Sequence, residues 1–203
     1  FESQDRDWVV VNSSPEEMEK KGFKPIGKDF PVFLHPKTNE EYALARTERK
    51  SGVGYKGFEF YFDSNVTLEE DLKRRDFTIN SIAKDQNGRL IDPYNGIVDL
   101  EKKIFRHTSP AFAEDPLRVL RFARFKSYEQ LHEFKLHKET AVFFKKIINA
   151  NELQNLSPER VWMETKKALQ NKYSDEFFKS VIEYQIINPW FKDLKRVSCD
   201  GEL

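Results

Sequence analysis

Two carboxylates stand two residues apart in Asp5-Arg6-Asp7, directly before the β-branched run Val9–Val11. On a strand, side chains two apart point to the same face, so this spacing places both carboxylates side by side. Such a pair repels itself unless a cation lies between, and hard oxygen ligands suit Mg²⁺. Two magnesium ions held in this way bridge nucleotide phosphates and an attacking hydroxyl. The same spacing also fits a solvated strand end, so alone it leaves both interpretations open.

A second group of chemically useful residues is Arg74-Arg75-Asp76. A capping box from Thr67 to Glu70 predicts a helix start, and a charge then falls where the apolar stripe of that helix should continue. The stripe consists of Leu68, Leu72, Ile79 and Ile82. Arginines suit phosphate oxygens, and an adjacent aspartate suits a ribose hydroxyl. The alternative is a basic surface pair with a local ion pair.

The third group lies between Glu114 and Phe125, where Asp115 and Arg118 are one helical turn apart. Pro116, Val119, Leu120 and Ala123 form one apolar face, and Arg118, Arg121 and Arg124 follow the other side. An aspartate accepts from the exocyclic amino group of cytosine or adenine, while an arginine donates to the ring nitrogen. Uracil and guanine present a carbonyl instead, so the pair would accept C and A. The alternative is an ordinary salt bridge between the two side chains.

The fourth group, from Ser157 to Glu164, has Ser157 as helix cap, Pro158 at the first position and an expected pair between Arg160 and Glu164. We interpret this group as a structural brace for a helical lobe. The four histidines lack metal-ligand spacing, and the single cysteine, Cys199, excludes an internal disulfide framework.

Composition narrows the class of protein. The 203 residues carry 34 Lys or Arg and 34 Asp or Glu, which excludes a uniformly polycationic nucleic-acid coat. The segment from Glu101 to Lys146 is basic, with eleven Lys or Arg against six Asp or Glu, and forms either a solvated helical face or a stripe for a polyanion. The aromatic content of 14% argues against disorder. No apolar run approaches the ~20 residues of a membrane span, so no membrane partner is expected.

The expected elements place these groups in an α+β chain. Strands are predicted at 5–11, 30–34 and 41–45, a short helix from Pro15 to near Gly22, and turns at Asn87-Gly88 and 92–96. After Pro110 nearly everything is predicted to be helix, down to about Tyr184. The order is therefore mixed α/β first and all-α second, with the boundary between Gly96 and Pro110.

In this order and spacing, the four groups resemble the class II tRNA nucleotidyltransferase family. This family includes CCA-adding enzymes and bacterial poly(A) polymerases, and the bacterial multifunctional CCA proteins are the most similar subgroup. The stretches DRDWVVV, EEYALARTERKSG, LEEDLKRRDFTIN, DPYNG and SPAFAEDPLRVLRFARF carry the likeness, which runs from Asp5 to about Leu169. The last ~30 residues carry little of it.

The resemblance implies a nucleotidyltransferase head of the polymerase-β-like type at residues 1–105 and an all-α neck and body at 106–203. It implies Mg²⁺-dependent addition of CMP, CMP and AMP to the 3′ end of tRNA without a nucleic-acid template, with ATP and CTP as substrates. The expected location is the cytoplasm. The oligomeric state is left open, with a monomer favoured.

The resemblance also implies residue roles. Asp5 and Asp7 match the metal-binding, catalytic carboxylates, and Glu41 is a candidate third carboxylate. The nucleotide-binding matches are Arg74, Arg75 and Asp76 for ribose and triphosphate, Asp115 and Arg118 as the amino-acid template for the base, and Arg121 and Arg124 beside it. The segment 46–60 matches a loop that helps switch specificity from C to A.

Two departures from the family pattern keep alternatives open. The glycine-pair motif that precedes the catalytic aspartates is absent from this sequence, so the chain as given is expected to be catalytically weakened. No His-Asp pair is present, so the phosphohydrolase activity of multifunctional members is not predicted. The alternatives are an A-adding enzyme or poly(A) polymerase of the same family, and a truncated, non-catalytic RNA-binding fragment.

Overall fold

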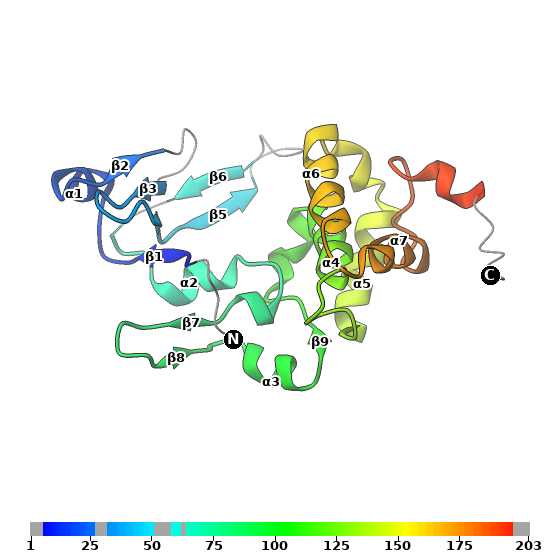
Figure 1. Cartoon of the computed structure of the whole chain (residues 1–203), viewed down its shortest axis with the longest axis horizontal. Helices are drawn as coiled ribbons and strands as arrows, with labels where there is room; N and C mark the ends of the chain where they lie inside the picture. Colours follow the sequence, from blue (N-terminus) through cyan, green and yellow to red (C-terminus); the bar gives the residue numbers. More distant parts are fainter. Residues whose placement is uncertain (1–5, 27–31, 51–57, 62–63, 197–203) are drawn as a thin grey trace. The chain divides into compact units, whose positions relative to one another are not determined.

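The computed structural model describes residues 6–26, 32–50, 58–61 and 64–196. The chain divides into two compact units, one of residues 1–52 and 56–74 and one of residues 53–55 and 75–203. Mixed strands and helices make the fold α+β, as predicted (Figure 1). The expected domain boundary between residues 105 and 106 stays a prediction.

The first unit is built on a four-stranded mixed sheet with the order β1-β4-β3-β2. Its strands are β1 (Trp8–Val10), β2 (Lys24–Pro25), β3 (Val32–Leu34) and β4 (Glu41–Leu44), with β1 parallel to β4 and the other neighbours antiparallel. A second antiparallel pair joins β5 (Thr47–Lys50) to β6 (Phe58–Tyr61). The side chains of Met18, Phe33 and Leu44 form the buried core of the sheet.

Both helices of this unit begin where the sequence predicts. Helix α1 (Pro15–Lys20) has Ser14 as its cap and proline in its first turn. Helix α2 (Leu68–Lys73) starts with the capping box: Thr67 Oγ1 accepts from the N–H of Glu70, and the carboxylate of Glu70 accepts from the N–H of Thr67. Each cap satisfies backbone donors that a helix start leaves open.

The prediction that the second helix continues to Ile82 is wrong, because α2 ends at Lys73. The chain after Arg75 pairs instead with residues 106–108, forming an isolated bridge between Phe77 and His107. The N–H of Thr78 donates to the carbonyl of Arg106 over 2.9 Å, and the N–H of Thr108 donates to the carbonyl of Asp76 over 3.1 Å. These long-range bonds replace the local bonds that a longer helix would make.

The second unit begins with short elements and continues as a helical bundle, which confirms the prediction of mostly helix after Pro110. The short elements are η2 (Thr78–Asn80), the hairpin β7 (Ala83–Lys84) and β8 (Leu90–Ile91), α3 (Gly96–Glu101), β9 (Ile104–Phe105) and η3 (Pro110–Glu114). The bundle holds α4 (Leu117–Lys126), α5 (Lys138–Asn149), η4 (Glu152–Asn155), α6 (Pro158–Leu169), α7 (Ser174–Glu183) and η5 (Lys192–Arg196). Strand β10 (Lys135–Leu136) interrupts the helical run and pairs with β9.

Helix α4 lies at the centre of this unit and packs against α6 and α7. Phe122, near its middle, is fully buried and contacts the rings of Phe105, Phe144 and Tyr184 at centroid separations of 5.2, 5.3 and 5.2 Å. Aromatic pairs at such separations add to the stability gained by burial. Within the described residues, no helix has the length and apolar character needed to cross a membrane.

Gly96, at the start of α3, packs closely against the backbone of Thr78. A Cβ at Gly96 would lie 2.2 Å from the Thr78 carbonyl oxygen and 2.8 Å from Ile82 Cγ1. The backbone of Thr78 cannot move aside without a large energetic cost. We therefore expect Gly96→Ala to lower the free energy of unfolding by about 3 kcal/mol, measured by urea denaturation. Gly88→Ala, with φ +84° but 3.6 Å of space, is the control and should cost about 1 kcal/mol. Equal losses in the two variants would contradict this account.

Candidate functional site

Two carboxylates lie at one end of the parallel strands β1 and β4. Trp8 pairs with Tyr42 in the parallel register, so the residues directly before them, Asp7 and Glu41, are neighbours on the same face. Both side chains are exposed. Exposed carboxylate oxygens at one sheet edge repel each other and form a suitable donor set for a hard divalent cation.

Asp5, the other predicted metal ligand, lies outside the described residues. Within the part of the chain that the structure describes, no group of three His, Cys, Asp or Glu side chains forms a metal site. The residues that are described nevertheless fit Mg²⁺, because Asp7 and Glu41 supply oxygen ligands at neighbouring positions.

Arg74 directly follows the last residue of helix α2 and is held by a carboxylate that the sequence analysis did not single out. Asp71, only 1% exposed, accepts from Arg74 Nε at 3.0 Å and from Arg74 Nη2 at 2.9 Å. The signal was available: Asp71 lies beside Leu68 and Leu72 on the apolar stripe of a helix, where a charge needs a partner.

Asp76 lies in the second unit, beyond the end of α2, and is 5% exposed. Its Oδ1 accepts from the N–H of Phe77 at 2.8 Å and from Asn80 Nδ2 at 2.9 Å, while Oδ2 accepts from Arg121 Nε at 2.7 Å. Burial alone would raise the pKa of Asp76, but the charge of Arg121 and these hydrogen bonds outweigh burial and hold it below its ordinary value. Arg75, its neighbour, donates from Nη1 to the carbonyl of Asn80 at 3.2 Å.

The three arginines of α4 do not form a solvated face, so that interpretation of the basic segment is wrong for these residues. Arg118 and Arg124 are buried, and Arg121 is about one third exposed. Arg124 forms an ion pair with Glu164 and stacks on the ring of Phe125 at 4.4 Å. The reason is packing: α4 is covered by neighbouring helices on its basic side as well as its apolar side.

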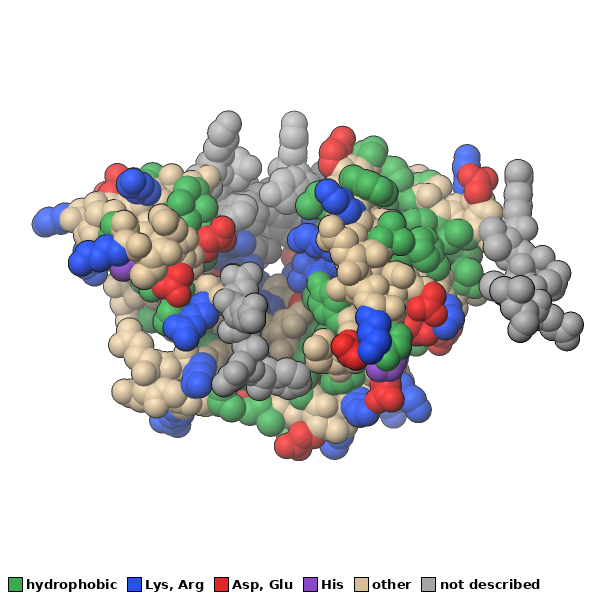
Figure 2. Space-filling view, in the orientation of Figure 1, with side chains coloured by type: hydrophobic (Ala, Val, Ile, Leu, Met, Phe, Trp, Pro, Cys, Tyr) green, Lys and Arg blue, Asp and Glu red, His purple; other side chains and the backbone are tan. Residues whose placement is uncertain are grey.

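Six lysines of the same segment are exposed: Lys102, Lys103, Lys135, Lys138, Lys145 and Lys146. Figure 2 shows blue and red side chains interspersed over the lower and right-hand parts of the second unit, while blue side chains gather near the centre of the view. Exposed basic charge in this segment is therefore carried mainly by lysines, and Arg121 is the one α4 arginine among the described residues that is partly exposed.

Asp115 is held by Arg160, a residue that the sequence analysis assigned only to a local helix pair. Arg160 Nη2 lies 3.2 and 3.0 Å from the two oxygens of Asp115, and the N–H of Leu117 donates to Asp115 Oδ1 at 3.1 Å. Glu164, one turn further along α6, accepts from Arg124 and lies 3.9 Å from Arg121 Nη1. The expected role of Arg160 and Glu164 as a pair with each other is therefore corrected: the structure directs both toward α4 and its start.

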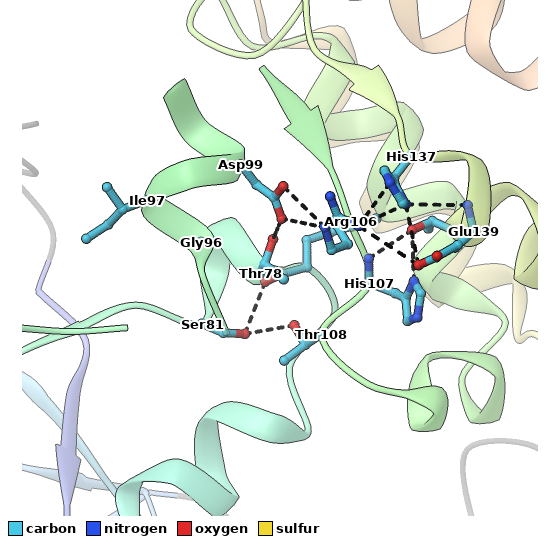
Figure 3. Close-up of polar contacts among 12 residues, drawn as sticks. Thr78, Ser81, Gly96, Ile97, Asp99, Arg106, His107, Thr108, His137 and Glu139 are labelled. Carbon is cyan, nitrogen blue, oxygen red and sulfur yellow. Dashed lines mark hydrogen bonds and ion pairs between the residues drawn. The ribbon is translucent and has the colours of Figure 1, made fainter. Parts of the chain in front are cut away.

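A second buried carboxylate holds the turn after Asp76 (Figure 3). Asp99, from α3, accepts from Thr78 Oγ1 at 2.7 Å and from Arg106 Nε at 3.0 Å. Arg106 Nη1 also lies 2.9 Å from a ring nitrogen of His137, the cap of α5. The turn that carries Asp76 is thus tied to both α3 and the helical bundle.

Comparison with known proteins decides the family. The model of the poly(A) polymerase head domain matches residues 2–106, just over half of the chain. A second model, described as the probable RNA and SrmB-binding site of polymerase A, matches residues 133–197.

The chain belongs to the class II tRNA nucleotidyltransferase family.

Solved structures agree with this membership. The Bacillus stearothermophilus CCA-adding enzyme in complex with CTP has a TM-score of 0.70 and 28% identity, covering 88% of this chain and 43% of its own. A tRNA nucleotidyltransferase complexed with a primer tRNA and an incoming ATP analogue has a TM-score of 0.68 and 30% identity, covering 92% of this chain and 53% of its own. A tRNA-processing enzyme without ligand has a TM-score of 0.68 and 29% identity, covering 93% and 49%. This family member therefore spans about half the length of the proteins it matches.

Breaking the buried pair of Arg124 and Glu164 should destabilise the helical bundle. We expect Glu164→Gln to lower the free energy of unfolding by about 3 kcal/mol, because it leaves a buried guanidinium without its counter-charge. Urea denaturation measures the loss. Glu159→Gln, an exposed change on the same helix, is the control and should stay near wild type. If the two variants unfold alike, Glu164 does not stabilise Arg124.

The lowered pKa of Asp76 predicts a pH dependence of stability. The ionised carboxylate stabilises the fold at pH values above its ordinary pKa of 3.8, and this contribution is lost as the pH falls through the lower folded value. We expect Asp76→Asn to cost about 2 kcal/mol at pH 7, with the difference from wild type shrinking below pH 4. Urea denaturation from pH 7 to pH 2.5 checks this. A difference that stays constant over that range would contradict the ion pair.

Proposed function

We propose that the protein carrying this chain is a CCA tRNA nucleotidyltransferase, which adds CMP, CMP and AMP to the 3′ end of tRNA without a nucleic-acid template. The observation that carries the proposal is the placement of Asp115 and Arg118 one turn apart at the start of α4, with Asp115 held by Arg160. Similar structures contain CTP in one case and a primer tRNA with an ATP analogue in another.

Asp115 and Arg118 have the chemistry to select a base. A carboxylate accepts from the exocyclic amino group that cytosine and adenine share, and a guanidinium donates to the adjacent ring nitrogen. Uracil and guanine would present a carbonyl to the carboxylate and lose that bond. The two contacts from Arg160 fix the direction of the carboxylate, because they engage both of its oxygens.

The remaining nucleotide contacts are assigned by charge and position. Arg74, Arg75 and Arg121 would neutralise the triphosphate, and Asp76 would contact the ribose while it keeps Arg121 in place. Arg124 is buried in an ion pair with Glu164, and this pair would stabilise helix α4, which carries Arg121. In this assignment Arg74, Arg75, Arg121 and Asp76 contact the nucleotide, and Arg124 only supports them.

Asp7, Asp5 and Glu41 are the residues that would hold Mg²⁺. When bound, this ion neutralises charge on the phosphate oxygens of the incoming nucleotide. The 3′ hydroxyl of the RNA attacks the α-phosphate in line and pyrophosphate leaves, with the carboxylates fixing the geometry of the reacting groups. No covalent intermediate with the protein is required.

A second candidate function is addition of A alone, to tRNA or to mRNA tails. The observation that favours it is the description of both matching family models, which name poly(A) polymerase. A third candidate is RNA binding without catalysis, for which the proposed partner is also tRNA.

We place the protein in the cytoplasm, where tRNA 3′ ends are processed, and propose that it acts as a monomer.

Incorporation of labelled CTP and ATP into a tRNA that lacks its CCA end tests the proposal, using the natural full-length protein with Mg²⁺. We expect C and then A to be added, and we expect Asp7→Asn to reduce the rate at least 10³-fold because a metal ligand is lost. Glu19→Gln, an exposed change on α1, is the matched control and should retain full activity. Use of ATP without CTP would support the A-adding candidate. Binding of tRNA without any transfer would support the binding fragment.

A further inference from the structure

Asp71 is a buried charge that the roles assigned above do not use. It lies in the six-residue helix α2, and only 1% of its surface is exposed. A carboxylate is almost never this buried without hydrogen-bonding partners. Its position therefore has to be explained by what it contacts.

A single oxygen of Asp71 accepts three N–H groups. Oδ1 lies 3.0 Å from Arg74 Nε, 2.9 Å from Arg74 Nη2 and 3.2 Å from the backbone N of Arg46. The two contacts from Arg74 fix both the position and the plane of its guanidinium, because the donors are rigidly attached to each other. A guanidinium has five N–H donors, and these two contacts engage two of them.

The third contact connects this arginine to a different part of the unit. Arg46 lies between the end of β4 and the start of β5, which is the first strand of the β5–β6 pair. The carboxylate of Asp71 thus holds the base of the β5–β6 pair and the guanidinium of Arg74 against the same oxygen. The two segments therefore share one hydrogen-bond acceptor.

We propose that Asp71 is a positioning residue for the nucleotide triphosphate: it orients Arg74 toward the phosphates and links that orientation to the base of the β5–β6 pair. The proposal rests on the proposed function. Asp71 itself contacts no substrate and acts through Arg74. A carboxylate that merely capped the helix would affect stability alone.

The test compares nucleotide binding and turnover in Asp71→Asn, Arg74→Gln and the double variant of the natural full-length protein. Equilibrium binding of a non-hydrolysable ATP analogue and of CTP is measured by calorimetry, together with kcat and KM for CMP addition. We expect Asp71→Asn to weaken binding of both nucleotides and to raise both KM values about tenfold, with kcat changed less than threefold. The double variant should be no worse than Arg74→Gln, because Asp71 acts through that residue.

Glu70→Ala is the matched control. It removes the side-chain acceptor of the capping box on the same helix, so it lowers the melting temperature without touching Arg74. Nucleotide binding by this variant should equal that of the wild type. Asp71→Glu, which keeps the charge, should recover part of the affinity lost in Asp71→Asn.

Three results would overturn the proposal: unchanged binding in Asp71→Asn, tighter binding in that variant, or additive losses in the double variant. A loss of binding in Glu70→Ala equal to that in Asp71→Asn would also overturn it, because helix stability would then be the cause. A wild-type protein that binds nucleotides but transfers none would refute the proposed function and leave this binding comparison valid.

Discussion

Helix α4 carries charged side chains into the interior of the second unit, and this constraint shapes much of the surrounding structure. A guanidinium removed from water costs several kcal/mol unless a counter-charge and hydrogen bonds replace its hydration. Arg124 has Glu164 from α6, and Arg121 has Asp76 from the turn after α2. Both acids come from segments distant in the sequence, so the need to pair these arginines fixes where those segments lie.

The pairing of charged residues between α6 and α4 also explains how the proposed base-reading residues are held. Helix α6 presents Arg160 and Glu164 one turn apart, so a single helix holds Asp115 at the start of α4 and Arg124 near its end. The proposed base-reading groups are therefore oriented before any nucleotide arrives, and little conformational freedom remains to be lost on binding. Base selection without a nucleic-acid template requires such a fixed array, since the protein alone supplies the pattern of donors and acceptors.

Local patterns predicted the helix starts, since a cap and its partner lie within four residues of each other, as in the capping box that begins at Thr67. The end of α2 was not predictable in this way, because pairing with residues 106–108 decides it. The burial of Arg118 and Arg124 was missed for the same reason: the covering helices are distant in the sequence. Glu164 interrupts the apolar stripe of α6, so the reasoning applied to Asp76 could have found it.

Equilibrium binding of the four ribonucleoside triphosphates tests most directly whether Asp115 and Arg118 distinguish one base from another. Calorimetry on the natural full-length protein with Mg²⁺ measures each affinity under one set of conditions. The account predicts that CTP and ATP bind at least ten times more tightly than UTP and GTP, because Asp115 accepts from the amino group that only the first two present beside a ring-nitrogen acceptor. Equal affinities for all four would contradict the assignment of Asp115 and Arg118 as the template.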